Sequence, residues 1–479
     1  MTPGRAAVRG FLGGPDLSGN SGRTYRIHLA YAMLDGTAGG ILLNAPIVAI
    51  KAFEAANWHL PLRELYSGIG MIAAVYLGSW MASRRKMPFV FVPGVLAGVS
   101  TLLMAGVTDS AFAFLTMLGI GAMFENVTRP AVTTILRLNY PVQRRGHATG
   151  EARKWSSLAF VVSSLVSALL LQVASDCQQT SVADGFEGGA GALLGWTIGH
   201  MAHLLMVLAG LLSIASFLCF RQIRVEEDPH AQRHDIKPEI GRTLRDAVAV
   251  VACDRRYRRY LLGCFVDGFF QMLYLPLVWV FLSKTLGFGY VGCSALMHAI
   301  PALVAFATTG LVGKLLDRSN PWIAWACIRF IWGLDAILLA ATPFVATLFP
   351  PAIVLLPVAA RVLRGSVQGG WWILWWQIGV THFAPPGGDT SRYMGIMAFL
   401  HGMIRLTASA AGMALAALAV PPATLIAVGG LGVIFSGVYS LINGLRERRV
   451  MHLETTADFE QQFLDERGAF QDRFEQAAH

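Results

Sequence analysis

The chain has 479 residues, of which 54% are hydrophobic and 14% charged, and its formal net charge is +9. Soluble domains average about 45–50% apolar and about 25% charged residues, so this composition excludes an ordinary soluble protein. It requires long apolar segments, and runs of about 20 such residues span a bilayer as helices. The sequence therefore predicts an all-α membrane protein.

The remaining composition argues against several classes of site. The six cysteines have no paired spacing, so we expect neither a disulfide framework nor a metal site. We find no phosphate-binding loop, no dinucleotide fingerprint and no metalloprotease or serine-hydrolase motif. We therefore expect a protein that is not an enzyme and that needs no cofactor.

Apolar segments of helical length recur along the chain. The residues between them are polar or charged, and the boundaries follow from where the apolar runs end. Twelve transmembrane helices are predicted, at 27–50, 61–82, 87–106, 111–139, 155–175, 195–220, 259–283, 291–313, 321–346, 350–380, 393–420 and 423–445.

The longest polar stretch divides these spans into two sets of six. It carries mixed apolar and basic residues over 240–260, which indicates a helix lying on the membrane surface. The predicted segments are an N-terminal stretch 1–26, a six-helix bundle 27–220, a linker 221–258, a second bundle 259–445 and a tail 446–479.

Lys and Arg in the connections set the orientation. They gather in alternate connections, with Arg84, Arg85 and Lys86 as the first cluster, and they are scarce in the others. Because basic loops stay in the cytoplasm, we expect both termini to be cytoplasmic in an inner membrane. The positive net charge is then a topology signal, and we expect no nucleic-acid partner.

Sequence repeats link the two bundles. Asp35-Gly36 in the first span corresponds to Asp267-Gly268 in the seventh. The connection Pro141–Gly150 after the fourth span corresponds to Pro386–Gly395 in the second half. Apart from these repeats, Gly78 after the second span is followed by the basic cluster Arg84-Arg85-Lys86, and after the eighth span the chain reads Gly313-Lys-Leu-Leu-Asp317-Arg318. The halves are thus pseudo-symmetric.

These motifs resemble the major facilitator superfamily over nearly the whole chain. The resemblance implies the major facilitator fold and alternating access, with a substrate site near mid-membrane between the bundles. It also implies a gating role for the two cytoplasmic loops, through Gly78, Arg84, Arg85, Gly313, Asp317 and Arg318. The family pattern has an Asp-Arg pair in each of these loops. The loop after the second span departs from this pattern, because Ala82 and Ser83 stand at those two positions.

Ionisable residues inside the spans are the candidates for transport, because each is costly in a bilayer. A buried carboxylate can bind and release a proton, so Asp35, Asp267 and Glu125 are the candidates for proton coupling. For Asp35 and Asp267 the alternative is a structural acid bonded to a neighbouring helix. Glu125 and Arg129 are four residues apart, so an internal ion pair is equally consistent with the sequence.

Basic and aromatic residues are the candidates for substrate binding. Arg361 and Arg364 share a helix face and are suited to gripping a carboxylate or phosphate, or to a structural role. The full set is Arg129, Arg361, Arg364, Trp372, Trp376, His401 and Arg405. Packing against lipid or neighbouring helices is the alternative for the last four.

The function that fits these observations is secondary active transport of a small organic solute coupled to protons, and the intramembrane arginines favour an anion as that solute. We expect a monomer whose other partner is the lipid bilayer. One alternative is an exporter of amphiphilic, lipid-like or drug compounds, favoured by the aromatic residues of the tenth span. A second is a membrane sensor or assembly partner that uses a transporter fold and moves nothing.

Overall fold

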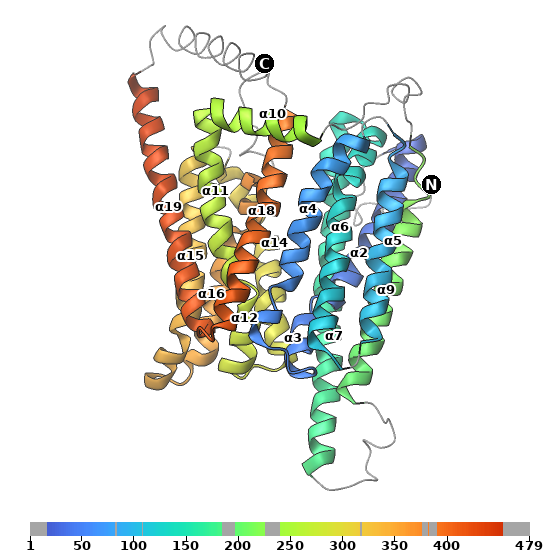
Figure 1. The fold of residues 1–479 in the computed structure, drawn as a ribbon, viewed down its shortest axis with the longest axis vertical. Helices are drawn as coiled ribbons and strands as arrows, with labels where there is room; N and C mark the ends of the chain where they lie inside the picture. The colour runs from blue at the N-terminus through green and yellow to red at the C-terminus, as the bar shows by residue number, and fades with distance from the viewer. Residues whose placement is uncertain are drawn as a thin grey trace, which may run out of the picture. The chain divides into compact units, whose positions relative to one another are not determined.

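Backbone amides inside a bilayer must be paired within the chain, so apolar segments of this length form helices. The computed structural model describes residues 17–81, 84–107, 109–183, 197–225, 240–316, 319–375, 382 and 390–453. Every regular element in these ranges is a helix, as the sequence predicts (Figure 1). By contacts, the chain forms two units.

The first unit comprises residues 1–236 together with 287–299. Within it α2 packs on α7 and α9, α4 on α6, and α5 on α6 and α9. Its described elements are α2 (Gly19–Leu42), α3 (Ala45–Lys51), η1 (Asn57–His59), α4 (Leu62–Met81), α5 (Met87–Ala105), α6 (Ala111–Asn139), α7 (Val142–Ala183), α9 (Ile198–Phe220), α13 (Tyr290–Ser294) and η4 (Ala295–Ala299).

The second unit comprises residues 237–286 and 300–479. Within it α15 packs on α16 and α19, α14 on α16, and α11 on α18 and α19. Its described elements are α10 (Ile240–Cys253), α11 (Arg255–Tyr274), α12 (Leu277–Val280), η3 (Phe281–Thr285), α14 (Ile300–Leu316), α15 (Pro321–Leu348), α16 (Ala352–Ile373), α18 (Thr390–Ala417) and α19 (Pro422–Leu453).

Eleven of these helical stretches are long and apolar enough to cross a membrane. The remaining predicted span, 61–82, corresponds to α4, a 20-residue helix with Arg63 and Glu64 in its first turn. It lies beside α6 like any spanning helix of the unit. The twelve-helix prediction is therefore consistent with the structure.

The largest difference from the predicted elements lies in α7. The helix begins at Val142, directly after Pro141, and runs for 42 residues, whereas the sequence predicted a span beginning at 155. At 1.5 Å per residue it is about 63 Å long, twice the thickness of the hydrocarbon core. The charged residues 143–154 therefore belong to a helix, not to a loop.

The predicted surface helix 240–260 is two helices. α10 ends at Cys253, and the Asp254 side chain accepts a hydrogen bond from the Tyr257 amide as the N-cap of α11. Figure 1 shows α10 running across the end of α11, with its axis turned away from the long helices of its unit.

Small residues allow the helices of the first unit to approach closely. A Cβ atom on Gly36 would collide with the Ser156 carbonyl oxygen, and one on Gly40 would collide with Ser163 and the Phe160 carbonyl. Asn44, the N-cap of α3 just after α2, donates to the Ser164 carbonyl oxygen at 2.8 Å. The α2–α7 contact is therefore a backbone-to-backbone contact fastened by buried polar groups.

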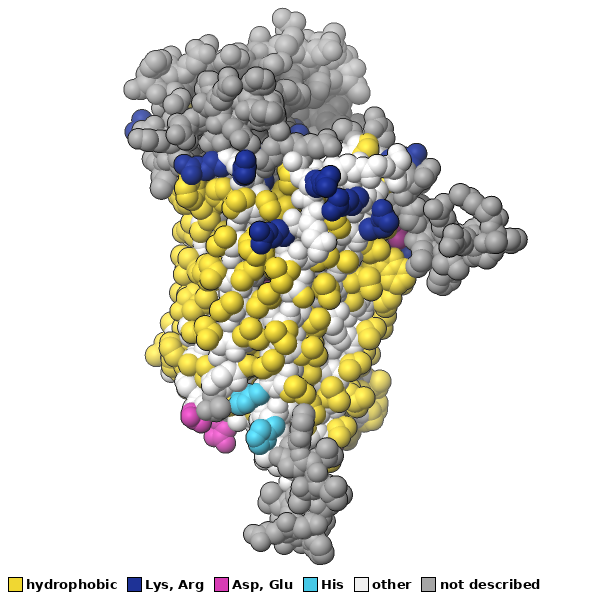
Figure 2. All heavy atoms as spheres, turned by 90° about the vertical axis from the view of Figure 1, so that its right-hand side faces the viewer, with side chains coloured by type: hydrophobic (Ala, Val, Ile, Leu, Met, Phe, Trp, Pro, Cys, Tyr) yellow, Lys and Arg dark blue, Asp and Glu magenta, His cyan; other side chains and the backbone are white. Residues whose placement is uncertain are grey.

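The face of the first unit that Figure 2 shows has the charge distribution of a membrane protein. Figure 2 shows an apolar band, with Lys and Arg side chains at one end and acidic and His side chains at the other. This is the arrangement that a bilayer with a basic cytoplasmic border would match.

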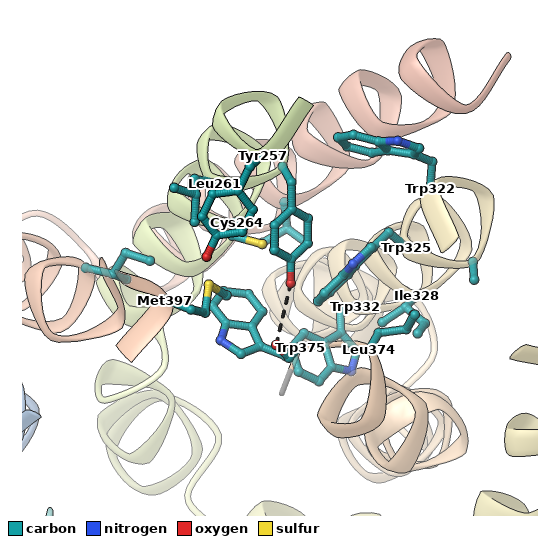
Figure 3. Packing of buried hydrophobic residues seen from close by; sticks show 14 of the residues in the cluster. Tyr257, Leu261, Cys264, Trp322, Trp325, Ile328, Trp332, Leu374, Trp375 and Met397 are labelled. Atoms are coloured by element: carbon teal, nitrogen blue, oxygen red, sulfur yellow. Dashed lines mark hydrogen bonds between the residues drawn. The ribbon is translucent and has the colours of Figure 1, made fainter. Parts of the chain in front are cut away.

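The second unit has a core rich in tryptophan (Figure 3). Trp325 and Trp375 are completely buried, with ring centroids 5.6 Å apart, and Trp371 lies 5.1 Å from Trp332. Aromatic contacts at these separations add to the stability that burial gives. These side chains fix how α15 and α16 pack.

Candidate functional site

Charged side chains from three helices of the first unit lie together. Asp35 of α2 interacts electrostatically with Glu125 and Arg129 of α6 and with Arg153 of α7. Tyr31, one turn before Asp35, interacts with the same three residues. The cluster holds two carboxylates and two guanidinium groups, so its charges balance when all four are ionised. We call it the first-unit charge cluster.

The Glu125–Arg129 pair of this cluster is accessible. Arg129 Nη2 lies 3.1 Å from Glu125 Oε1, as their spacing predicts, yet the two side chains are 51% and 45% exposed. Asp35 is partly buried, and Arg153 is exposed. Charged groups on a lipid-facing surface are costly, so a set converging from three helices is expected to face water or a solute.

The second unit arranges its intramembrane charges differently. Asp267 of α11 lies 3.5 Å from Arg329 Nε of α15, and both side chains are almost wholly buried. Gln271 donates to Asp267 at 3.2 Å, and Arg329 bonds to Ser440 and to the Ser436 carbonyl of α19. This pair joins three helices, which favours the structural alternative for Asp267.

The two arginines of α16 share one acid. Arg361 Nη2 lies 3.2 Å and Arg364 Nη1 3.5 Å from the two oxygens of Asp335, which is itself fully buried. Arg364 also stacks on the Trp332 ring at 4.8 Å. Both guanidinium groups therefore already have an anionic partner, and an anionic solute would have to compete with Asp335 for them.

The remaining substrate candidates that the structure describes lie on α16 and α18. Arg405 Nε donates to His401 Nε2 at 3.1 Å, so this ring nitrogen is unprotonated, and His401 also contacts the Trp375 ring. Trp372 lies on α16, and its side chain is not among those described; Trp376 lies outside the described residues. Neighbouring Trp371 and Trp375 pack in the core of the unit.

The predicted gating loops are described in part. Arg84 lies over the Trp80 ring at 4.9 Å, and Arg85 is exposed. Gly78 has open space where a Cβ would be, and Gly313 lies in the last turn of α14. Asp317 and Arg318 lie outside the described residues.

A polar contact joins the start of α11 to the last part of α19. Arg256 of α11 bonds to Glu447 of α19 at 2.5 Å and to His382 at 3.0 Å. Burial and the nearby Arg256 charge lower the pKa of His382. The imidazole is therefore neutral and accepts a hydrogen bond from Arg256.

Sequence reasoning missed two members of the first-unit charge cluster and the pairing of two residues in the second unit. Arg153 was assigned to a connection because the predicted span began at 155, although Pro141 signals a helix start well before that residue. Tyr31 has no charge to mark it. The Asp267–Arg329 pair joins residues far apart in the chain, and no local spacing predicts it.

Comparisons with known proteins agree with an all-helical fold that carries charged side chains inside its spans. A family model, Major Facilitator Superfamily, matches residues 29–408. A search of curated protein sequences found no match.

Solved structures of transporters share the fold at low sequence identity. The nucleoside transporter NupG is 14% identical with a TM-score of 0.59, and the match covers 88% of this chain and 98% of that one. A bacterial homologue of the human lysosomal transporter Spinster is 14% identical, with a TM-score of 0.58 and coverage of 90% and 96%. The xylose transporter XylE from E. coli is 13% identical, with a TM-score of 0.56 and coverage of 88% and 97%.

The matched region exceeds half of the chain and includes spans of both units. The chain is a member of the Major Facilitator Superfamily and has the multi-pass fold of its transporters.

Proposed function

We propose that the protein is a secondary active transporter that moves a small organic anion together with a proton, and that the first-unit charge cluster is its coupling site. The observation that carries the proposal is the convergence of Asp35, Glu125, Arg129 and Arg153 from three helices, with the Glu125 and Arg129 side chains about half exposed. The buried pairs of the second unit are better suited to holding helices together.

The net charge of the first-unit charge cluster supports the transport of a proton and an anion together. With all four groups ionised the cluster is neutral, and protonation of Asp35 leaves one positive charge. One bound monovalent anion restores neutrality. Both the empty and the loaded site then avoid an uncompensated charge in the membrane, which is the state that would oppose reorientation.

The basic border of the apolar band supports an orientation for the proposed transporter. On the face in Figure 2, Lys and Arg gather at one end. We therefore place the protein in a cytoplasmic membrane with that end, and both termini, in the cytoplasm.

A proton-flux assay tests the proposal. Purified protein is reconstituted into liposomes loaded with the pH dye pyranine, and monocarboxylates, dicarboxylates, sugars, nucleosides and lysolipids are added outside in turn. We expect one class of organic anion to acidify the lumen. Acidification by none of these compounds, or movement of lysolipids alone, would overturn the proposal, and the second result would support the amphiphile exporter.

Asp35→Asn separates coupling from binding. The variant keeps the shape of the site but cannot release a proton, so we expect solute-driven acidification to fall to background while exchange of labelled solute across the membrane continues. Asp109→Asn, which changes an exposed loop acid, is the matched control and should behave as wild type. Acidification that persists in Asp35→Asn would exclude Asp35 as the coupling group.

A further inference from the structure

A hollow lies at the basic end of the first unit, away from the charge cluster. Its volume is about 640 Å³, and it is formed by the start of α5 and the residues around the end of α9. Arg85 and Arg221 line it together with Met87, Pro88, Phe91 and Val92, and Ile223 and Val225 complete the lining. It therefore combines two cations with an apolar wall.

The two arginines are available to a ligand. Both are exposed, and within the described part of the chain neither forms an ion pair. The Arg221 guanidinium lies 4.7 Å from the centroid of the Phe91 ring, which orients it at the rim of the hollow. Arg84 and Lys86 flank Arg85 in the chain and add positive charge.

An apolar stripe continues from the hollow along α5. Val92, Leu96, Val99 and Leu103 are exposed at helical spacing, so they share one face. Leu211 and Leu218 are exposed on α9, which packs beside α5. A ligand with a charged head in the hollow could therefore lay an alkyl chain along these side chains.

We propose that this hollow is a binding site for the headgroup of an anionic phospholipid. Guanidinium groups grip phosphate oxygens with paired hydrogen bonds, and basic pockets between helices at the cytoplasmic border recognise acidic lipid heads. The apolar stripe receives an acyl chain, which a free phosphate compound lacks. The site is independent of the solute and is expected to stabilise the α5–α9 pair.

Lipid titration of the purified full-length protein tests the site. Native mass spectrometry and thermal unfolding in a mild detergent are followed as phosphatidylglycerol or cardiolipin is added, with phosphatidylcholine as the zwitterionic comparison and glycerol 3-phosphate as the head without chains. We expect saturable binding and a raised melting temperature with the acidic lipids only. A response to glycerol 3-phosphate equal to that of the lipids would assign the hollow to a soluble phosphate instead and overturn the proposal.

Variants locate the binding. Each of Arg85→Gln and Arg221→Gln is expected to weaken acidic-lipid binding about fivefold, and the pair more than about tenfold. Arg26→Gln removes the same charge from an exposed position on α2 and is the matched control. Val92→Trp, which fills the hollow and keeps every charge, should also weaken binding. Equal weakening by Arg26→Gln, or none in the double variant, would contradict the site.

Discussion

The same residue types have opposite environments in the two units. Asp267 and Asp335 are fully enclosed and each lies against guanidinium groups, whereas Glu125 and Arg129 are about half exposed. Removing one partner of an enclosed pair leaves a buried charge without compensation, which is far more costly than disturbing an exposed pair. The same conservative substitution should therefore have unequal effects in the two places.

We expect Asp267→Asn to destabilise the protein by about 3 kcal/mol or more, because it leaves Arg329 charged and enclosed. Glu125→Gln should cost under about 1 kcal/mol, since its pair is accessible. The double variant Asp267→Leu/Arg329→Met should recover much of the loss. Thermal unfolding measures all three, and equal melting temperatures for Asp267→Asn and Glu125→Gln would contradict this distinction.

At the scale of the element, close helix contacts depend on single glycines. Gly40 of α2 meets the backbone and Ser163 of α7 directly, whereas a Cβ on neighbouring Gly39 would lie 3.5 Å from the Phe160 ring, an ordinary contact. Gly40→Ala should therefore lower stability by about 1–3 kcal/mol through overpacking. Gly39→Ala, the control on the same helix, should change it little. Comparable melting temperatures for the two variants would show that α2 and α7 are less tightly packed.

The membrane-spanning helices were predictable from the sequence, whereas the side-chain contacts between them were not. Long apolar runs fixed the existence of the spans, and 111–139 agrees with α6 at both ends, because bilayer thickness and backbone pairing leave few options. The start of α7 was missed because charged residues 143–154 resemble a loop when only hydropathy is considered. The partners of Asp35 and Asp267 depend on helix rotation, which a single sequence does not contain.

At the scale of the whole molecule, the balanced first-unit charge cluster predicts electroneutral transport. One proton and one monovalent anion move together in the proposed cycle, so no net charge crosses the membrane. A potassium-diffusion potential imposed with valinomycin should leave uptake unchanged, whereas a pH gradient should drive it. Uptake that follows the membrane potential at constant pH would exclude a one-to-one stoichiometry.

Residues 287–299 determine when the first unit can be completed during synthesis of the chain. They follow residues 237–286 of the second unit in the chain, yet their contacts belong to the first unit: the Tyr290 amide donates to Gln172 at 2.8 Å, and Ser294 donates to the Ser164 carbonyl at 3.3 Å. A ribosome that has completed every span before residue 236 has therefore not yet made every part of the first unit. The first unit is therefore completed only after the seventh span has been inserted. Its last contacts form while the second unit is being synthesised.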